Sequence, residues 1–182
     1  MRKLGFALLL MVLTASLPQQ CIASGSDSTK IQWLSWQEAM DLYQNEKRKI
    51  VLDVYTDWCG WCKRMDQVTF QHPDIALYIN KNFYPVRFNA ESSEELEYKN
   101  KVYRAVKTDK REYHEFANEL LKGRFSFPTM VFMNEDLELI QSIIGFKTPR
   151  QFEQIASYFA SNHYKKTPWS VYQKAFKSMI AD

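Results

Sequence analysis

The sequence predicts a single α/β domain in which strands and helices alternate around one central sheet. Residues 50–55 (IVLDVY) form a short, almost wholly apolar run rich in β-branched and aromatic side chains, which is typical of a buried strand. A Cys-x-x-Cys pair, Cys59 and Cys62, then opens a segment dominated by helix formers. A proline, Pro128, enters a later apolar strand. With 182 residues, 46% of them hydrophobic, the chain can bury a core without help from disulfides or metal.

The first 23 residues have the pattern of a signal peptide. Two basic residues precede an apolar stretch over 4–17, and an A-x-A-like cleavage site ends at Ala23. The apolar stretch is too short for a stable membrane-spanning helix, so we expect export to the periplasm, with secretion as an alternative. An uncleaved anchor and a lipoprotein attached through Cys21 are further alternatives, although the two glutamines before Cys21 do not suit lipidation.

Charge and cysteine content narrow the function classes. The formal net charge is +3, and two of those charges lie within residues 1–23, so the mature chain is nearly neutral and lacks the basic clusters of a nucleic-acid surface. Cleavage after Ala23 leaves Cys59 and Cys62 as the cysteines of the mature chain. In an oxidising compartment such a pair is a structural staple or a redox couple. A staple across so short a loop removes little chain entropy, which favours the redox couple.

The elements before the central strand are a linker, a strand and a helix. Residues 24–30 form a polar linker, and a short strand over 31–34 follows. Ser35 and Glu38 have the spacing of a capping box, which predicts a helix that runs to Asn45. Apolar residues recur along this helix at core-facing spacing, namely Trp36, Ala39, Met40 and Tyr43.

The segment with the cysteines places Cys59 at the N-terminus of a helix. The unpaired amides and the positive dipole end stabilise a thiolate there, so Cys59 is the expected nucleophile. Cys62 lies one turn further on and faces inward, as a resolving thiol does. Asp53 interrupts the buried strand, and burial without a partner raises the pKa of a carboxyl group. The helix is expected to reach Phe70, with a second helical segment over 74–82 after a proline.

Residues 53–63 (DVYTDWCGWCK) resemble the active-site segment of thioredoxins, in which an apolar strand containing Asp leads into W-C-G-P-C-K. Trp61 departs from the family, which has proline there. The resemblance covers residues 31–160, with an insertion. Over this range the sequence resembles secreted thioredoxin-like proteins that have an enlarged middle region. It implies a thioredoxin-like three-layer α/β/α fold with a mixed central sheet over 31–162. The matching residues are Asp53, Trp58, Cys59, Gly60, Cys62 and Lys63.

The resemblance also assigns residues outside this segment. Arg87, in a predicted strand over 84–89, occupies the place of a lysine near the buried acid; the alternative is an exposed strand cation. Phe127 and Pro128, with the threonine that follows, resemble the family's Ile-Pro-Thr, in which the proline follows a cis peptide and faces the cysteines. A cis bend would free the backbone of Phe127 to pair with an extended substrate; the alternative is a trans proline. Gly145 matches a glycine that lets substrate approach closely.

The middle region, residues 91–113, is charged and longer than the corresponding thioredoxin segment. Tyr98, Val102 and Val106 stand at i, i+4 and i+8 and predict a helical insertion with one apolar stripe. We expect it to cover the fold, the alternative being that it shapes a partner surface. Residues 114–121 predict another helix, which ends near a glycine.

The remaining sequence predicts the last strands and the C-terminal helices. Strands over 130–133 and 137–144 are joined by a hairpin turn. Thr148 as N-cap and Pro149 in the first turn begin the last core helix. Residues 163–182 predict a helical extension that packs back on the domain, with a partner helix or a membrane-bound helix as alternatives.

Together these features predict an enzyme, an exported thiol–disulfide oxidoreductase that needs no cofactor. The Cys59 thiolate attacks a disulfide of a protein substrate, and Cys62 then releases the product. Asp53 accepts the proton of Cys62 directly or through water. The residues expected to support the site are Trp58, Gly60, Trp61, Lys63 and Arg87, and those expected to bind substrate are Phe127, Pro128 and Gly145.

The direction of electron flow rests on Trp61. Its side chain adds no charge or polar donor between the cysteines, which favours a reductant that receives electrons from a separate membrane donor. A disulfide oxidase or isomerase and a non-catalytic binding or chaperone module of the same fold are the alternatives. A zinc site would need two further ligands, and His72, His114 and His163 lack paired spacing, so no metal is expected. The sequence makes no prediction of oligomeric state.

Overall fold

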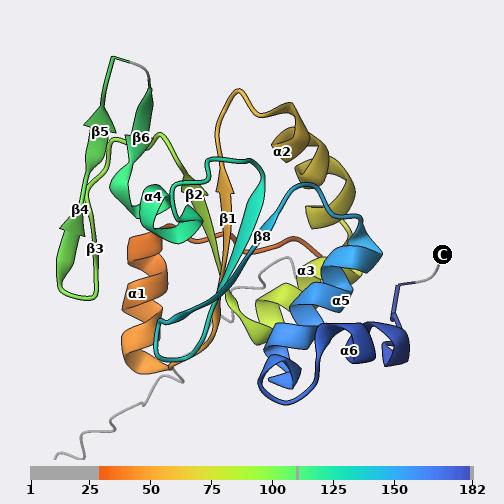
Figure 1. The fold of residues 1–182 in the computed structure, drawn as a ribbon. Helices are drawn as coiled ribbons and strands as arrows, with labels where there is room; N and C mark the ends of the chain where they lie inside the picture. The colour runs from red at the N-terminus through yellow and green to blue at the C-terminus, as the bar shows by residue number, and fades with distance from the viewer. Residues whose placement is uncertain (1–28, 110, 181–182) are drawn as a thin grey trace, which may run out of the picture.

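The computed structural model describes residues 29–109 and 111–180 (Figure 1). The predicted signal peptide, residues 1–23, lies outside the described residues, as does all but the end of the linker over 24–30. Cys21 lies outside the described residues with them.

A mixed four-stranded sheet in the order β2-β1-β7-β8 forms the centre of the domain. β1 pairs in parallel with β2 and antiparallel with β7, and β7 pairs antiparallel with β8. The predicted strand over 31–34 is reduced to one parallel bridge between Leu34 and Val86, beyond β2. The strands are β1 (Ile50–Tyr55), β2 (Tyr84–Asn89), β7 (Thr129–Met133) and β8 (Leu139–Ile144).

Helices cover both faces of this sheet, which confirms the predicted three-layer arrangement (Figure 1). One face packs against α1 and α4, and the other packs against α2, α3 and α5. The helices are α1 (Trp36–Asn45), α2 (Gly60–Met65), a π-helix (Asp66–Phe70), α3 (Pro73–Asn82), α4 (Glu115–Leu121), α5 (Pro149–Ala160), a 3₁₀ turn (His163–Lys165) and α6 (Trp169–Ala175).

The alternation of side chains along β1 determines where its one charged residue lies. Ile50, Leu52 and Val54 belong to the core on the α1 and α4 face, whereas Val51 belongs to the core on the α2, α3 and α5 face. Because side chains alternate along a strand, Asp53 faces the same side as Val51, toward the helix that carries the cysteines.

Two helix starts that the sequence predicts have complete capping boxes. Ser35 at the start of α1 accepts a hydrogen bond from the Glu38 backbone N–H, and the Glu38 side chain accepts one from the Ser35 N–H. Thr148 and Gln151 form the same reciprocal pair at the start of α5. These short-range polar patterns therefore set both boundaries correctly.

The predicted helical insertion over 91–113 is wrong, because this region forms two β-hairpins. Lys99 and Asn100 both have positive φ angles, of 51° and 60°, which build the tight turn of the first hairpin. Tyr98 and Tyr103 are buried against Phe116, with ring centroids 5.3 and 5.5 Å away. Tyrosine and valine stabilise strands when such packing is available. The strands are β3 (Leu96–Tyr98), β4 (Lys101–Tyr103), β5 (Ala105–Lys107) and β6 (Glu112–His114).

The insertion is fastened to the domain by His114 at the end of β6. Its ring is fully buried and lies 5.2 Å edge-on from Phe88. The Nδ1 atom accepts a hydrogen bond from the Phe116 backbone N–H at 3.1 Å, which caps α4. Nε2 therefore carries the proton and donates it to the Glu94 carbonyl at 2.9 Å. The neutral imidazole is thus the form that fits, and burial lowers the pKa of His114.

We expect His114→Ala to lower the free energy of unfolding by about 2 kcal/mol at pH 8, because the helix cap and the tie to Glu94 are lost. The lowered pKa of the folded state means that the unfolded chain binds the proton more readily, so the contribution of His114 to stability falls as the pH drops below about 6.5. Urea unfolding at pH 8 and pH 5.5 measures both effects, with half-exposed His72→Ala as the control. Equal pH dependence in wild type and His114→Ala would contradict this role.

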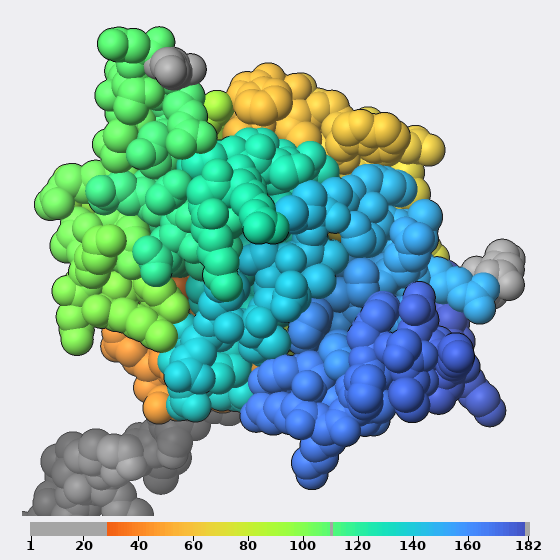
Figure 2. All heavy atoms as spheres, viewed as in Figure 1, coloured from red at the N-terminus to blue at the C-terminus, as the bar shows by residue number. Residues whose placement is uncertain are grey.

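The C-terminal extension packs back on α5, as the sequence predicts. Tyr172 of α6 is buried, and its hydroxyl donates a hydrogen bond to the Ser157 Oγ at 2.9 Å. The buried carboxylate of Glu153 accepts hydrogen bonds from the Met179 backbone N–H at 2.7 Å and from the Ser178 hydroxyl. None of the helices in the described residues is long and apolar enough to cross a membrane. In Figure 2 the insertion and the extension lie at opposite sides of the molecule.

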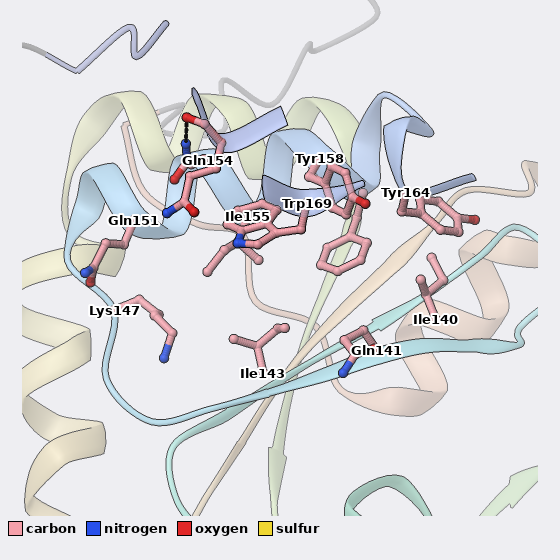
Figure 3. Close-up of a pocket in the computed structure, with 12 residues that line it drawn as sticks. Ile140, Gln141, Ile143, Lys147, Gln151, Gln154, Ile155, Tyr158, Tyr164 and Trp169 are labelled. Carbon is pink, nitrogen blue, oxygen red and sulfur yellow. Dashed lines mark hydrogen bonds between the residues drawn. The ribbon is translucent and has the colours of Figure 1, made fainter. Parts of the chain in front are cut away.

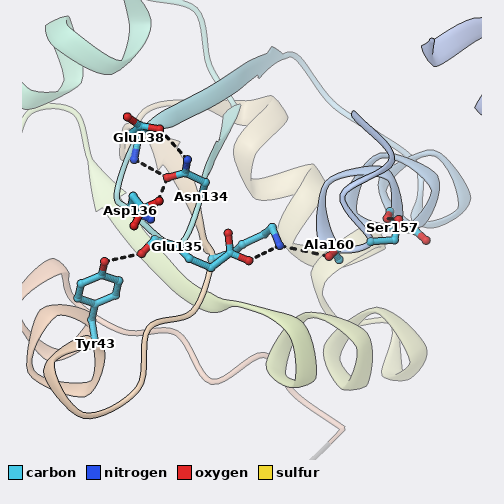
Figure 4. Close-up of polar contacts among 9 residues, drawn as sticks. Tyr43, Asn134, Glu135, Asp136, Glu138, Ser157 and Ala160 are labelled. Atoms are coloured by element: carbon cyan, nitrogen blue, oxygen red, sulfur yellow. Dashed lines mark hydrogen bonds and ion pairs between the residues drawn. The ribbon is translucent and has the colours of Figure 1, made fainter. Parts of the chain in front are cut away.

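A buried lysine, Lys49, fixes the end of the sheet at which β1 begins. Lys49 is 5% exposed, and its Nζ contacts the Glu135 carboxylate at 2.6 Å and the Ala160 carbonyl at 3.3 Å (Figure 4). The Tyr43 hydroxyl donates to the Glu135 carbonyl, so the turn between β7 and β8 is held from α1 as well as from β1. The cysteine segment follows the opposite end of β1.

Candidate active site

Cys59 and Cys62 are joined by a disulfide at the start of α2. The S–S distance is 2.17 Å and the Cα atoms are 5.3 Å apart. Cys59 is the N-cap residue of α2, as expected, and its Sγ accepts a hydrogen bond from the Cys62 backbone N–H at 3.1 Å. The positive end of the helix therefore already points an N–H group at the Cys59 sulfur, which favours a thiolate there when the bond is reduced.

The two sulfur-bearing residues are nearly buried in the oxidised form, with exposed fractions of 5% for Cys59 and 3% for Cys62. Met65, one turn further along α2, is fully buried in the core on that face. The helix then continues as the π-helix up to Phe70, where the sequence predicts its end. This wider turn begins at Asp66, and single π-turns occur often at functional sites.

Asp53 lies on the face of β1 that packs against α2, α3 and α5, and it is 1% exposed. Its Oδ1 atom is buried without a hydrogen-bond partner among the described residues, and its Oδ2 atom lies 3.7 Å from the Arg87 Nε atom. Burial raises the pKa of Asp53 to about 7, and the nearby Arg87 charge limits the rise. A carboxyl group with this pKa can bind or release a proton near neutral pH.

Arg87 lies directly opposite Asp53 in the pairing of β1 with β2. Its guanidinium lies 3.7 Å from the buried acid and is not an isolated surface cation. The guanidinium lies over the rings of Tyr55, at 4.7 Å, and Trp33, at 5.7 Å. Its Nη2 atom also forms a direct ion pair with the carboxylate of Asp66.

Asp66 is a site residue that the sequence analysis missed. It stands four residues after Cys62, a spacing that places two residues on the same face of a helix and could have identified it. Lys63, by contrast, is exposed and forms no ion pair among the described residues. The charged partners of Asp53 are therefore Arg87 and, through it, Asp66.

The Phe127–Pro128 peptide bond is cis, as the resemblance implies. Thr129, the next residue, pairs with Val54 near the end of β1, so the buried Pro128 enters the sheet at the end from which the cysteine segment leaves. The Phe127 backbone N–H and C=O have no hydrogen-bond partner within residues 29–109 and 111–180. These groups remain available to an extended chain laid along this edge.

Gly145 closes the site on the side of β8. Its N–H donates to the Pro128 carbonyl at 2.8 Å, and its φ of 85° lies in the region that favours glycine. The Lys147 Nζ atom donates hydrogen bonds to the carbonyls of three consecutive residues, Ile144, Gly145 and Phe146, at 2.7, 2.9 and 3.3 Å. Burial lowers the pKa of Lys147. This lysine holds the loop that carries Gly145 in one conformation.

Four aromatic side chains, Trp58, Trp61, Phe127 and Phe146, form an aromatic rim around the disulfide. Trp58 and Trp61 are 68% and 64% exposed, which is unusual for tryptophan. The Trp58 indole N–H donates to the Glu91 carboxylate at 3.0 Å, and its ring meets Phe127 edge-on at 6.0 Å. Trp61 lies 5.8 Å from Phe146. The residue that departs from the thioredoxin pattern thus belongs to this rim, and Gly60 between the tryptophans is exposed.

A separate cavity of about 660 Å³ lies between β8, α5 and α6 (Figure 3). It is lined by apolar and aromatic side chains such as Ile143, Tyr158 and Trp169, together with glutamines, and neither cysteine borders it. No group of three or more His, Cys, Asp or Glu side chains in the described residues is arranged to hold a metal ion.

A helix-capping Cys-x-x-Cys disulfide, a buried acid on the strand that precedes it and a cis-proline at the same sheet end define a protein of the thioredoxin class. The profile of the thioredoxin-like domain family matches residues 36–160, and the chain belongs to this family.

Three comparisons show how far the similarity extends. Spermatogenesis-associated protein 20 from Rattus norvegicus is 34% identical over 74 residues, which are 40% of this chain and 9% of that protein. The thiol:disulfide interchange protein DsbD from Photorhabdus laumondii is 31% identical over 83 residues, which are 41% of this chain and 14% of that protein. The chain thus spans a small part of both curated relatives. A thioredoxin-fold protein from Helicobacter pylori has a TM-score of 0.53 at 18% identity, over 71% of this chain and 80% of that one.

Proposed function

We propose that the protein is a thiol–disulfide oxidoreductase that acts on disulfide-containing proteins through Cys59 and Cys62. The observation that carries the proposal is the disulfide at the N-terminus of α2, placed at the sheet end where the cis-proline enters. The helix N-terminus lowers the pKa of a thiol, and the cis-proline frees an adjoining backbone edge for substrate. A structural staple needs neither feature.

The reduced protein carries out two successive thiol–disulfide exchanges. The Cys59 thiolate attacks one sulfur of a substrate disulfide, a mixed disulfide forms, and the other substrate sulfur leaves as a thiolate. Cys62 passes its proton to the Asp53 carboxylate, and the resulting thiolate attacks the Cys59 sulfur. The substrate leaves with both sulfurs reduced, and Cys59 and Cys62 are oxidised to the disulfide. Two electrons and two protons from a separate donor restore the dithiol.

The substrate binds through the extended polypeptide segment that flanks its disulfide. The free backbone N–H and C=O of Phe127 pair with this segment, and the aromatic rim provides apolar contacts on both sides of it. Gly145, held by its bond to the Pro128 carbonyl, leaves room for the substrate backbone to approach. Trp58, Trp61 and Gly60 therefore support binding, whereas Asp53 and Arg87 support proton transfer.

The protein works as an exported reductant. Residues 1–23 have the pattern of a signal peptide, which supports the periplasm as the site of action, with secretion or a lipid anchor at Cys21 as alternatives. The similarity to the thiol:disulfide interchange protein DsbD supports disulfide exchange with protein partners. Trp61 adds no charge between the cysteines, which supports the reducing direction, and a membrane protein supplies the electrons.

Reduction of insulin disulfides with dithiothreitol as electron source tests the proposal. We expect the wild-type protein, produced without residues 1–23, to accelerate insulin precipitation, and Cys59→Ser/Cys62→Ser to give the uncatalysed rate. Circular dichroism shows whether both proteins fold. A folded wild type with no effect on insulin reduction would favour a non-catalytic binding module and overturn the assignment.

The redox potential of the cysteine pair decides the direction. A value near the thioredoxin potential, about −270 mV, fits a reductant, whereas a value near about −180 mV, that of protein disulfide isomerase, fits an oxidase or isomerase. Equilibration of the Cys59–Cys62 pair with glutathione or dithiothreitol buffers measures it.

A further inference from the structure

Two carboxylates share the one guanidinium of Arg87. Asp66 contacts it directly, through Nη2, whereas Asp53 lies 3.7 Å from Nε. At that distance the Nε–H group and the Asp53 Oδ1 atom both lack a hydrogen-bond partner among the described residues. Arg87 therefore forms its stronger contact with Asp66, outside the core, and its weaker contact with the buried Asp53.

We propose that Asp66 is a positioning residue of the active site: it holds the Arg87 guanidinium toward itself, so that Arg87 balances the charge of Asp53 only in part. The proposal rests on the proposed function, in which Asp53 accepts the proton of Cys62. A guanidinium bonded directly to Asp53 would keep that carboxylate ionised and a poor proton acceptor. Asp66 prevents this by forming the direct ion pair itself.

The geometry of the three elements supports this division. Arg87 stands in β2, directly opposite Asp53 in β1, whereas Asp66 opens the π-helix after the cysteine helix. The rings of Tyr55 and Trp33 lie against the guanidinium and restrict its movement. Because the π-helix begins at Asp66, the position of this acid is tied to the segment that carries Cys62.

The surroundings of Asp53 contain few other charges. The titratable groups that act on it are Arg87 from β2, Asp66 from the π-helix and Tyr55 from its own strand. On the side of β7 its partner is the apolar Met130. Burial raises the pKa of Asp53, Arg87 lowers it and Asp66 raises it again, in the directions that the proposal needs.

The ion pair between Arg87 and Asp66 borders a cavity that the cysteines do not line. This cavity has a volume of about 660 Å³, and Trp33 and Phe70 border it as well. Asp66 and Arg87 are 28% and 31% exposed at their side chains, whereas that of Asp53 is 2% exposed. The charge pair can therefore be altered without opening the disulfide to water.

Titration of the Asp53 carboxyl group by carbon NMR in the oxidised protein tests the proposal. We expect Asp66→Asn to lower the midpoint by about one pH unit or more, because Arg87 then attracts Asp53 without competition. Asp66→Glu keeps the charge and is expected to restore the wild-type midpoint. Asp57→Asn removes an exposed acid that accepts a hydrogen bond from Asn89, and is expected to leave it unchanged. Arg87→Met should raise it, and the Asp66 variants suffice if Arg87→Met does not fold.

The pH profile of the resolving step provides the second readout. In single turnovers with a mixed disulfide on Cys59, Asp66→Asn is expected to shift the profile to lower pH by the same amount as the NMR midpoint. An unchanged or raised midpoint in folded Asp66→Asn would overturn the proposal even if insulin is reduced normally. A lowered midpoint in a protein inactive on insulin would support the role of Asp66 and reject the proposed function.

Discussion

Replacing Cys62 with serine is expected to convert the protein into a trap for its substrates. Cys59 still attacks a substrate disulfide, but the residue one turn below it can no longer release the product. We expect insulin turnover to fall by about three orders of magnitude or more, as for loss of an essential nucleophile. Mixed disulfides that dissolve on addition of dithiothreitol should appear on non-reducing gels and by mass spectrometry.

Cys59→Ser is the matched control for this trap, since it also removes one sulfur of the pair. Cys62 is buried at 3% exposure and lies inside the first turn of α2, away from the free N-terminal end. We therefore expect Cys59→Ser to lose turnover without collecting adducts. Adducts on Cys62 in Cys59→Ser at the level seen on Cys59 in Cys62→Ser would reverse the assignment of nucleophile and resolving thiol.

Local patterns were enough to predict most of the active site. The apolar run before Cys59, the pair spacing and the helix formers after it act over neighbouring residues, and the structure has the strand, the N-cap and the disulfide in those places. The cis bond before Pro128 could also be predicted locally, because proline is the residue at which a cis bond costs little. The acid in the middle of the strand was also recognisable, since it interrupts an apolar run typical of a buried strand.

Features that depend on tertiary packing were missed. Tyr98, Val102 and Val106 satisfy a helical period, but the buried contact of Tyr98 with Phe116 and the left-handed turn at Lys99 favour a hairpin. A charged segment does not reveal this, because the partner of Tyr98 lies on a helix further along the chain. Asp66 was missed for a related reason: its spacing from Cys62 places it on the same helix face, but its ion-pair partner Arg87 belongs to a strand 21 residues away.

Asp53→Asn is expected to alter stability and activity in opposite directions. Burial raises the pKa of Asp53 from 3.8 to about 7, so the folded protein keeps a proton that the unfolded chain has already released. Between about pH 4 and pH 7, the contribution of Asp53 to stability therefore falls as the pH rises, by about 4 kcal/mol in total. The asparagine variant lacks this titration, so its free energy of unfolding relative to wild type should increase as the pH rises and should exceed the wild-type value at pH 8. Urea unfolding of both oxidised proteins from pH 4.5 to 8.5 measures it.

The same variant has no carboxylate to accept the proton of Cys62. We expect the resolving step to slow by about 100-fold, the lower range for loss of a general base, while Cys59 still forms the mixed disulfide. Quenched-flow samples should show this intermediate accumulating in Asp53→Asn and not in Asp57→Asn. If the role of Asp53 were only structural, the Asp53→Asn variant, which gains stability at pH 8, would not resolve the mixed disulfide more slowly. If stabilised Asp53→Asn resolved the mixed disulfide at the normal rate, Asp53 would not be the proton acceptor, and water would take the proton of Cys62.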